Sequence, residues 1–493
     1  MRASGILMGI SSIPSKYGMG CFSKEAYEFV DQLEQAGQQY WQILPLGPTG
    51  YGDSPYQSVS TFAGNPYFIN LEDLIEKGLL TRGECESCDW GGSESYVDYE
   101  KMYMSRYKLL RKAYERADLS KDEDYADFLK EEQNWLTDYC LFMAIKNDQK
   151  GICWIDWPEE LKDRHSKAVR EAEKELEEEI DFYRFQQYCF TTQWRKLKAY
   201  ANEKGISIIG DVPIYVALDS SDAWANPEML QFDKDHNPKS VAGCPPDAFS
   251  ATGQLWGNPL YDWNKMEANG FRWWRARMAH SAELYDVIRI DHFIGIVKYY
   301  TIPADMPDAR QGEYRQGPGQ KLLDVINESI GDKKIIAEEL GVEVPEVAKI
   351  LKENGYPGMK VLEFAFGGDR KNPHLPYNYT QNLVCYGGTH DNETLLGFFE
   401  DRGDWELGYA YDYLDTRDKG RMVDQVFRAA YSSVAVLTVF AVQDILKLGN
   451  WARMNLPSSM GNNWKWRMQK GQLGQHELEC MRYLASVFDR ERK

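Results

Sequence analysis

Residues 286–293, Asp-Val-Ile-Arg-Ile-Asp-His-Phe, carry the side chains that acid–base chemistry needs. Three of the eight are β-branched, which is typical of a buried strand, and charged residues interrupt and end the run. A buried strand that places the carboxylate of Asp291 at its carboxyl end predicts an active site at that end. A structural ion pair between Arg289 and Asp291 explains the same residues equally well.

Four apolar runs of the sequence end in a carboxylate. The acids are Asp211, Asp291, Glu338 or Glu339, and Asp391. In one cleft, three carboxylates can cleave a glycosidic bond. One attacks the anomeric carbon, a second of raised pKa protonates the leaving oxygen, and a third stabilises the oxocarbenium-like transition state. The pattern therefore indicates sugar chemistry, provided that the fold brings these acids together.

Eight apolar runs are predicted to be strands. They cover residues 5–10, 40–46, 206–211, 286–291, 333–339, 359–366, 382–391 and 434–442. Helical patterns lie between several of them, for example at residues 344–352 and 420–430. Strands that alternate with helices favour an α/β fold with a parallel sheet, and eight of them predict a (β/α)₈ TIM barrel whose active site lies at the carboxyl ends of the strands.

We expect residues 1–493 to form a single catalytic barrel with two insertions. With 493 residues and 43% hydrophobic content, the chain can bury one large core. Residues 51–185, after the second strand, begin as a turn-rich loop and become mostly helical and highly charged. Residues 213–285 are predicted to be a long loop and helical insertion over the active site. Long loops thus cover the carboxyl-end face of the barrel.

The charge balance excludes some partner classes. With 76 acidic and 57 basic residues, the formal net charge is −19, which argues against nucleic acid and anionic membranes as partners. A neutral ligand fits better. The chain has 15 Trp and 31 Tyr residues, and rings with a polar tip suit amphipathic ligands such as sugars, although most rings in any protein belong to the core.

The 9 cysteines show no regular spacing, which favours a reducing cytoplasm over a disulfide framework. Residues 5–10 are too short for a signal-peptide core, and residues 434–442 are too short for a membrane span. We therefore expect a cytoplasmic protein. We expect neither a metal nor another cofactor, since no compact Asp/Asn loop of the calcium-binding type is present. The oligomeric state stays open.

Six motifs carry a family resemblance that runs from residue 10 to residue 468. Three resemble the α-amylase clan: Arg289-Ile290-Asp291-His292, Ala337-Glu338-Glu339-Leu340-Gly341 and Thr389-His390-Asp391-Asn392. Three more resemble the amylomaltases, also called disproportionating enzymes or 4-α-glucanotransferases of glycoside hydrolase family 77. These are Asp53-Ser54-Pro55-Tyr56-Gln57, Pro245-Pro246-Asp247-Ala248-Phe249 and Gln254-Leu255-Trp256-Gly257-Asn258-Pro259.

The resemblance implies that Asp291 is the nucleophile, Glu338 the general acid/base and Asp391 the transition-state stabiliser. It also selects Glu338 over Glu339, because alternation along a strand shows only that the two side chains point in opposite directions. Arg289 is expected to keep Asp291 ionised, since a nearby cation lowers the pKa of a carboxylate.

The resemblance also implies a set of substrate contacts. They are Arg289, His292, His390, Asp211, Tyr56, Phe249, Gln254 and Trp256. Residues 243–259 are expected to cover the glucan beside the cleavage point, although Phe249 and Trp256 would also serve to anchor this loop to the barrel. Cys244 and Ala248 depart from the family pattern there. Tyr51 resembles a tyrosine that some relatives use at a second glucan site.

The leading hypothesis is a glucanotransferase that passes an α-1,4-glucan segment to the 4-hydroxyl of glucose or another α-1,4-glucan by a retaining double displacement. Its expected partners are α-1,4-glucans, maltooligosaccharides and glucose. A starch hydrolase of the same clan differs only in what attacks the intermediate. A barrel that binds glycans without catalysis would lack one of the three acids, and all three are present.

Overall fold

The computed structural model describes residues 2–50, 52–246, 250–341 and 344–492. Its centre is a sheet of eight strands in the order β10-β11-β12-β1-β2-β3-β6-β9, in which each ladder is parallel. The strands are β1 (Ala3–Leu7), β2 (Tyr40–Gln42), β3 (Ser207–Pro213), β6 (Val287–Asp291), β9 (Lys334–Ala337), β10 (Gly358–Val361), β11 (Leu383–Tyr386) and β12 (Leu437–Ala441).

The two edges of this sheet meet. The N–H of Ala337, in β9, donates to the carbonyl of Pro357, just before β10, at 3.0 Å. The eight strands therefore nearly close into a barrel, which confirms the fold predicted from the sequence.

All eight expected strands are present, but most are shorter than the apolar runs that predicted them. The run at 359–366 ends as a strand at Val361 and continues as the 3₁₀ helix η5 (Leu362–Ala365). The run at 382–391 ends at Tyr386, so Asp391 lies in a loop beyond β11. Asp211 lies inside β3 instead of at its end. Apolar composition marks burial, whereas a strand ends where its ladder of backbone hydrogen bonds stops.

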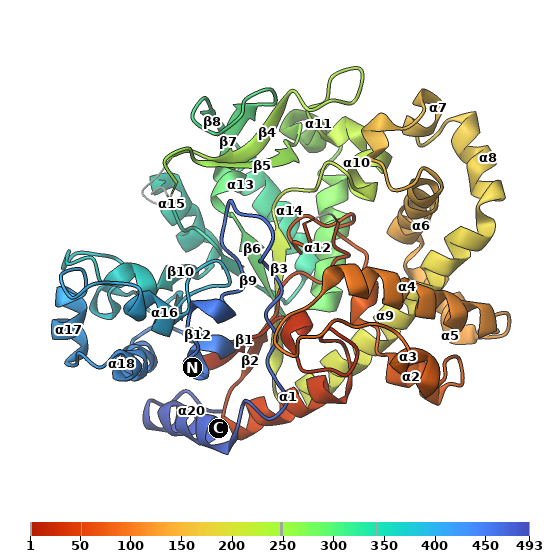
Figure 1. Cartoon of the computed structure of the whole chain (residues 1–493). Helices are drawn as coiled ribbons and strands as arrows, with labels where there is room; N and C mark the ends of the chain where they lie inside the picture. Colours follow the sequence, from red (N-terminus) through yellow and green to blue (C-terminus); the bar gives the residue numbers. More distant parts are fainter. Residues whose placement is uncertain (1, 51, 247–249, 342–343, 493) are drawn as a thin grey trace.

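Among the described residues between β2 and β3, ten helical segments are present, and they form the region at the right of Figure 1. They are η2 (Pro66–Phe68), α2 (Leu71–Glu76), α3 (Arg82–Glu86), α4 (Tyr99–Arg116), α5 (Glu123–Glu131), α6 (Gln133–Asp148), η3 (Trp154–Asp156), α7 (Glu159–Lys162), α8 (Lys167–Glu175) and α9 (Glu177–Glu203). Helix α9 has 27 residues and packs against both α6 and β3. It therefore connects the insertion to the barrel without a break at residue 185.

A second, antiparallel sheet, which the sequence did not predict, lies at the top of Figure 1 with the order β5-β4-β7-β8. Its strands are β4 (Ser240–Cys244), β5 (Gln254–Pro259), β7 (Lys298–Pro303) and β8 (Glu313–Gln316). The segment between β3 and β6 also contains α10 (Ser221–Ala225), η4 (Pro227–Met229), α11 (Trp263–Ala268) and α12 (Arg272–Leu284). The small sheet pairs part of the expected 213–285 insertion with chain that follows β6.

The remaining helices surround the barrel. They are η1 (Ile10–Ser12), α1 (Lys24–Gln35), α13 (Ile294–Val297), α14 (Gln320–Ile330), α15 (Pro345–Asn354), η6 (Pro376–Asn378), α16 (Leu395–Glu400), α17 (Gly408–Leu414), α18 (Lys419–Ser432), α19 (Val442–Ile445), η7 (Asn450–Ala452) and α20 (Gln475–Val487). Both chain ends lie on the same side of the molecule (Figure 1). Arg490, which is 0% exposed, ties them together because it donates to the carbonyls of Ala3 and Ser433, each at 2.9 Å.

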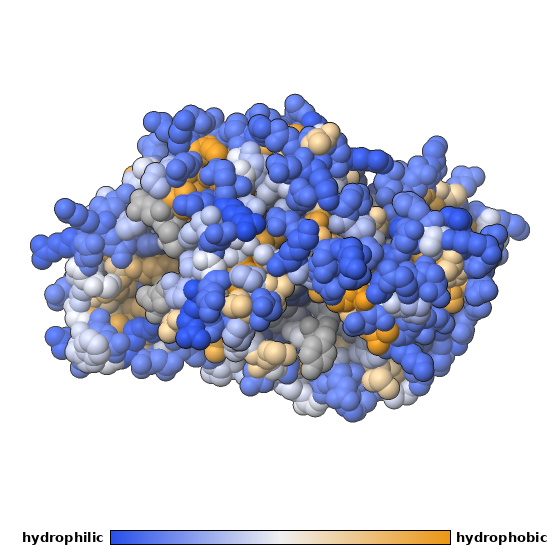
Figure 2. Space-filling view, turned by 90° about the horizontal axis from the view of Figure 1, so that it is seen from above, coloured by the Kyte–Doolittle hydropathy of each residue, from blue (hydrophilic) through white to orange (hydrophobic). Residues whose placement is uncertain are grey.

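The barrel strands are buried on both faces, as a parallel sheet covered by helices requires. Trp41, Ile208, Ile288 and Val439 belong to four different strands and share one continuous hydrophobic core. The face drawn in Figure 2 is mostly hydrophilic, with apolar side chains in small, scattered patches. Among the described residues, no helix is both long enough and apolar enough to cross a membrane.

Candidate active site

Arg289 of β6 lies at the centre of a buried ionic network. Its Nη1 lies 2.6 and 2.7 Å from the two carboxylate oxygens of Asp211 and 3.0 Å from Oδ1 of Asp291. Arg289 and Asp291 can meet because they lie two residues apart on one strand and so project from the same face. The structural ion pair considered above is thus present, and it lies inside the site.

Asp211 completes this network from the neighbouring strand, β3. It is buried, and it accepts a hydrogen bond from the hydroxyl of Tyr56 at 2.7 Å in addition to its pair with Arg289. The register places Asp211 directly beside Arg289. With its carboxylate engaged in this way, Asp211 is placed to orient Arg289 and Tyr56.

The pKa of Asp291 is raised to about 6, chiefly by burial, although the charge of Arg289 lowers it. Asp211 and Asp391 add to the increase, because like charges oppose ionisation. The cation therefore acts in the direction predicted from the sequence, but burial outweighs it. Asp291 is still largely ionised at pH 7.

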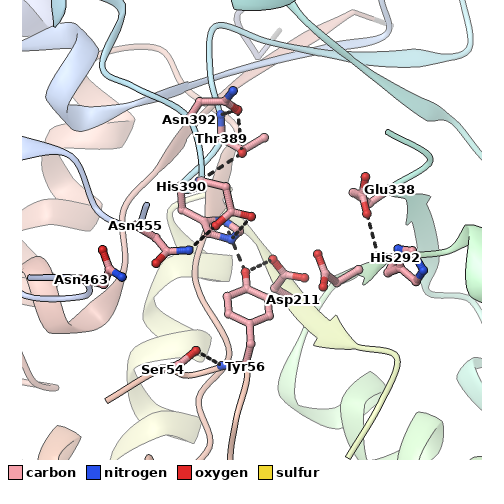
Figure 3. Close-up of polar contacts among 12 residues, drawn as sticks. Ser54, Tyr56, Asp211, His292, Glu338, Thr389, His390, Asn392, Asn455 and Asn463 are labelled. Atoms are coloured by element: carbon pink, nitrogen blue, oxygen red, sulfur yellow. Dashed lines mark hydrogen bonds and ion pairs between the residues drawn. The ribbon is translucent and has the colours of Figure 1, made fainter. Parts of the chain in front are cut away.

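Glu338 follows β9 and lies across from Asp291. Its Oε2 accepts a hydrogen bond from the N–H of His292 at 2.7 Å, and its Oε1 accepts one from the N–H of Leu340 at 2.8 Å. His292 adopts a left-handed backbone conformation with φ of 52°, which a side chain other than glycine seldom takes. Such conformations gather at functional sites. Figure 3 shows Glu338 pointing toward His292.

Burial raises the pKa of Glu338 to about 8, and the charge of Asp291 adds to the effect, whereas Arg289 opposes it. The group therefore carries a proton at neutral pH. This is the protonation state that a general acid needs.

The neighbouring acid, Glu339, points away from this site. Its Oε2 accepts a hydrogen bond from the N–H of Met359 at 2.7 Å, and its Oε1 lies 3.0 Å from Nζ of Lys360. Both partners belong to β10. Glu339 therefore ties β9 to its neighbouring strand, in agreement with the choice of Glu338 as the acid of the cleft.

Asp391 is held by groups from a distant part of the chain. Nδ2 of Asn455 donates to Oδ1 of Asp391 at 2.6 Å, and Arg453 donates to its carbonyl at 2.7 Å. Nε2 of His390 lies 3.4 Å from Oδ2. Burial by itself would raise the pKa of Asp391, but the charge and hydrogen bond of His390, helped by Asn455, lower it to about 2.

Tyr56 and His390 stack face to face and close one side of the site, with ring centroids 4.9 Å apart. The ring of Trp464 lies 5.7 Å from Tyr56 and 5.8 Å from His390. Figure 3 shows Tyr56 beneath His390 with Asp211 beside it. These rings offer an apolar wall with polar tips next to the acids, which is the kind of surface that sugars contact.

Trp256 and Gln254 of β5 lie on the other side of the site. The edge of Trp256 meets His292, with ring centroids 4.8 Å apart at 86°, and its Nε1 donates to Oε1 of Gln254 at 3.0 Å. Gln57 donates to the carbonyl of Trp256 at 3.3 Å and to Oδ1 of Asn258 at 2.8 Å. The loop that carries Tyr56 and the strand that carries Trp256 are therefore linked.

The three acids occupy different electrostatic states. At neutral pH, Asp391 is ionised, Asp291 is largely ionised and Glu338 carries its proton, because their pKa values are about 2, about 6 and about 8. Pairs of carboxyl groups whose environments separate their pKa values are typical of acid–base and nucleophilic catalysis. The arrangement can provide a nucleophile, a proton donor and a fixed negative charge in one site.

Comparison with known proteins decides the family. A family model described as 4-alpha-glucanotransferase matches residues 8–473. This chain belongs to the 4-alpha-glucanotransferase family. The match begins in the loop after β1 and runs through both insertions, so the insertions are part of the family fold.

Individual members of the 4-alpha-glucanotransferase family cover nearly the whole chain. The 4-alpha-glucanotransferase of Clostridium butyricum is 48% identical over 462 residues, which cover 93% of this chain and 95% of that protein. The Thermus thermophilus enzyme is 44% identical and covers 99% of each chain. The solved structure of amylomaltase from Streptococcus agalactiae in complex with acarbose has a TM-score of 0.96 at 39% identity and covers 100% of both chains.

Three residues that form contacts in this site were not among the site residues predicted from the sequence. Asn455 and Arg453 carry no local signal, because they meet Asp391 from a distant part of the chain, Asn455 across 64 residues. Gln57 lies in one of the six motifs, but its contact with Asn258 spans 201 residues. Phe249 and Tyr51, which the sequence assigned to glucan binding, lie outside the described residues, as does Ala248.

Among the described residues, one group has the spacing of a metal site: Glu132, His280 and Glu283. None of them belongs to the acid cleft. Glu132 is already engaged, since it accepts from Nε1 of Trp135 at 2.7 Å and from Arg195 at 3.2 Å. We assign no metal to these residues.

Proposed function

We propose that this member of the 4-alpha-glucanotransferase family transfers α-1,4-glucan segments by a retaining double displacement, with Asp291 as nucleophile, Glu338 as general acid/base and Asp391 as transition-state stabiliser. One observation carries the proposal: Asp291 at the end of β6, Glu338 directly after β9 and Asp391 beyond β11 have separated pKa values of about 6, about 8 and about 2. The partners are α-1,4-glucans, maltooligosaccharides and glucose.

In the first step, a carboxylate oxygen of Asp291 forms a bond to the anomeric carbon of the donor. The bond from that carbon to the leaving 4-oxygen breaks, and Glu338 gives its proton to that oxygen. Positive charge develops on the sugar ring, and the ionised carboxylate of Asp391 stabilises it. The product is a covalent glycosyl-enzyme and a shortened glucan.

In the second step, the 4-hydroxyl of an acceptor attacks the same carbon. Glu338, now ionised, takes the hydroxyl proton, and the ester bond to Asp291 breaks. Two inversions at one carbon restore the α configuration. Water in place of the acceptor would give hydrolysis, so the outcome depends on which group reaches the intermediate.

The substrate contacts follow from the geometry around the acids. Tyr56 and Trp256 line opposite sides of the cleft, one from each insertion, and we place a glucan between them, with Gln254 positioned to hydrogen-bond it. We also propose that Phe249, in the loop expected to cover the glucan, contacts the substrate, and that Tyr51 belongs to a second glucan site. The link between Gln57 and Trp256 holds the cleft walls together, which favours a bound acceptor sugar over water.

We also propose that this reaction takes place in the cytoplasm. The nine cysteines, all within the described residues, form no disulfide with one another, in keeping with the cytoplasm as the compartment.

Incubation with maltotriose tests the proposed function. We expect glucose and a ladder of longer maltooligosaccharides, with the number of reducing ends unchanged, because transfer makes one glycosidic bond for each one broken. Chromatography of the products and a reducing-end assay measure the two quantities. Steady growth of reducing ends without products longer than maltotriose would identify a hydrolase. No reaction at high enzyme concentration would identify a binding protein.

The pH dependence follows from the two acids of the first step. Asp291 must be ionised and Glu338 protonated, and their pKa values are about 6 and about 8. We expect kcat/KM for maltotriose to be highest near pH 7, to fall below pH about 6 as Asp291 gains a proton, and to fall above pH about 8 as Glu338 loses one. A profile that is flat from pH 5 to pH 9 would contradict these assignments.

A further inference from the structure

Glu363 is a buried acid that no step above uses. It lies in η5, directly after β10, and is 8% exposed. Its Oε2 has no hydrogen-bond partner among the described residues. A Cβ placed on Gly388 would lie 3.4 Å from this oxygen, so the carboxyl packs against the backbone that leads to the turn at residues 389–392.

A series of contacts connects Glu363 with Asp391. The side chains of Asn392 and Glu363 both flank Gly388, since a Cβ placed there would lie 3.1 Å from Cβ of Asn392 and 3.4 Å from Oε2 of Glu363, and the side chain of Asn392 lowers the pKa of Glu363. Oδ1 of Asn392 accepts from both the N–H and the hydroxyl of Thr389, each at 2.9 Å. The hydroxyl oxygen of Thr389 accepts from the N–H of Asp391 at 3.3 Å. Figure 3 shows Thr389 and Asn392 above His390, with a dashed contact between them.

The amide of Asn392 can serve this role in one orientation only. Because its oxygen accepts from Thr389, its NH₂ group must face Glu363 and needs an acceptor there. A carboxyl oxygen fixes that orientation. Without it the amide can rotate by half a turn, which would place NH₂ against the donors of Thr389 and break both bonds.

The charges around Glu363 keep it neutral. Burial raises its pKa to about 8, and the charges of Glu393 and Asp444 add to the increase, against the hydrogen bond of Asn392 and the charge of Arg402. Arg402 is engaged elsewhere, because its Nη1 donates to Glu393 at 2.9 Å. Asp444 accepts from the N–H of Leu395 at 2.7 Å. No free cation is thus available to pair with an ionised Glu363 among these neighbours.

We propose that Glu363 is a positioning residue for glucan transfer: as a buried carboxyl it fixes the amide of Asn392, and through Thr389 it holds the turn that presents Asp391 to the substrate. The inference rests on the role proposed above for Asp391. Glu363 itself touches no reacting atom.

Variants at Glu363 and Asn392 test this inference through kcat and KM for maltotriose at pH 6.5. Glu363→Ala is expected to lower kcat about tenfold while KM changes less than about threefold, because the bound glucan still meets the same walls. Glu363→Gln is expected to keep most of the activity, since its amide oxygen accepts the same hydrogen bond. Asn392→Ala should match Glu363→Ala, and the double variant should be no slower than Asn392→Ala, because both changes break one series of contacts.

Asp444→Ala is the matched control, since Asp444 is also a buried acid, and among the described residues its side chain accepts a hydrogen bond only from the N–H of Leu395. It should lower the melting temperature and leave kcat within about twofold. If it lowers kcat as much as Glu363→Ala does, loss of any buried acid explains the result and the inference fails.

Stability against pH gives a second readout. The pKa of Glu363 is raised from its ordinary value of 4.5 to about 8. Its contribution to stability is therefore complete below pH about 4.5 and is lost as pH rises through about 8. Relative to Glu363→Gln, which does not titrate, the wild-type melting temperature should fall steadily between pH 5 and pH 9. A difference in melting temperature that stays constant with pH would overturn the assignment of a neutral carboxyl to Glu363. This measurement does not depend on enzyme activity.

The remaining outcomes separate this inference from the proposed function. Full activity in Asp391→Asn would remove the role of Asp391, and the inference would fall with it. If Asp391→Asn is inactive but Glu363→Ala keeps its kcat, only the inference fails. If Glu363→Ala does not fold, the other two variants test the inference. An unchanged kcat in Asn392→Ala, or a tenfold loss of kcat in Glu363→Gln, would contradict the role assigned to Glu363.

Discussion

Asp291→Asn is expected to lower the rate of maltotriose disproportionation by about four to six orders of magnitude, the usual effect of removing a catalytic nucleophile. An amide does not attack the anomeric carbon, so the covalent intermediate cannot form. The fold should persist, since the amide oxygen of Asn can still accept from Nη1 of Arg289, which lies 3.0 Å from Oδ1. Initial rates from glucose release measure the effect. Asp235→Asn, at an exposed aspartate, is the matched control and should keep full activity.

The intermediate on Asp291 can be trapped directly. An α-glucosyl fluoride given to Glu338→Gln should still lose fluoride, because this leaving group needs no proton, and the sugar should stay on Asp291 because no base activates the acceptor. Mass spectrometry of a peptide digest locates the added sugar. Label on Asp391 or Asp211, or a product of inverted configuration, would contradict the double displacement at Asp291.

The second large effect concerns the two adjacent glutamates. Glu338→Gln should lower kcat for maltotriose by about two to four orders of magnitude, since it removes a positioned proton donor. Glu339→Gln should keep activity within about tenfold, because Glu339 contacts Lys360 and the N–H of Met359 in β10 and not the cleft. Steady-state kinetics of both variants decide the question.

A stability control accompanies this pair. Glu339→Gln loses the ion pair with Lys360, which is 3.0 Å long and partly buried, so a lower melting temperature is expected there. Rates are therefore compared well below both transitions. Equal losses of kcat in the two variants, or the larger loss at Glu339, would reverse the assignment.

The barrel was predictable because its strands are buried on both faces, and such strands form apolar runs that local sequence records. The run containing Ile288 and Ile290 became β6, and the motif around Glu338 lies directly after β9, as expected. The small antiparallel sheet was not predictable. Its strand β8 reads Glu-Tyr-Arg-Gln and is largely exposed, so neither composition nor alternation marks it.

The electrostatics could not be predicted either. From the sequence, Arg289 was expected to keep Asp291 ionised by lowering its pKa. In the folded chain burial outweighs this effect and raises the pKa of Asp291 to about 6. The direction of Glu339 also needed the structure, because alternation gives opposite faces without saying which face meets the cleft.

The sequence by itself predicted the eight-stranded plan, named three candidate acids and indicated the family, because apolar periodicity and contiguous motifs are local properties of the chain. The tertiary structure decided how those acids are held. Asn455 reaches Asp391 across 64 residues, and Tyr56 reaches Asp211 across 155. The protonation of each carboxyl depends on burial and on charges brought near it by folding, and neither quantity exists in the unfolded chain.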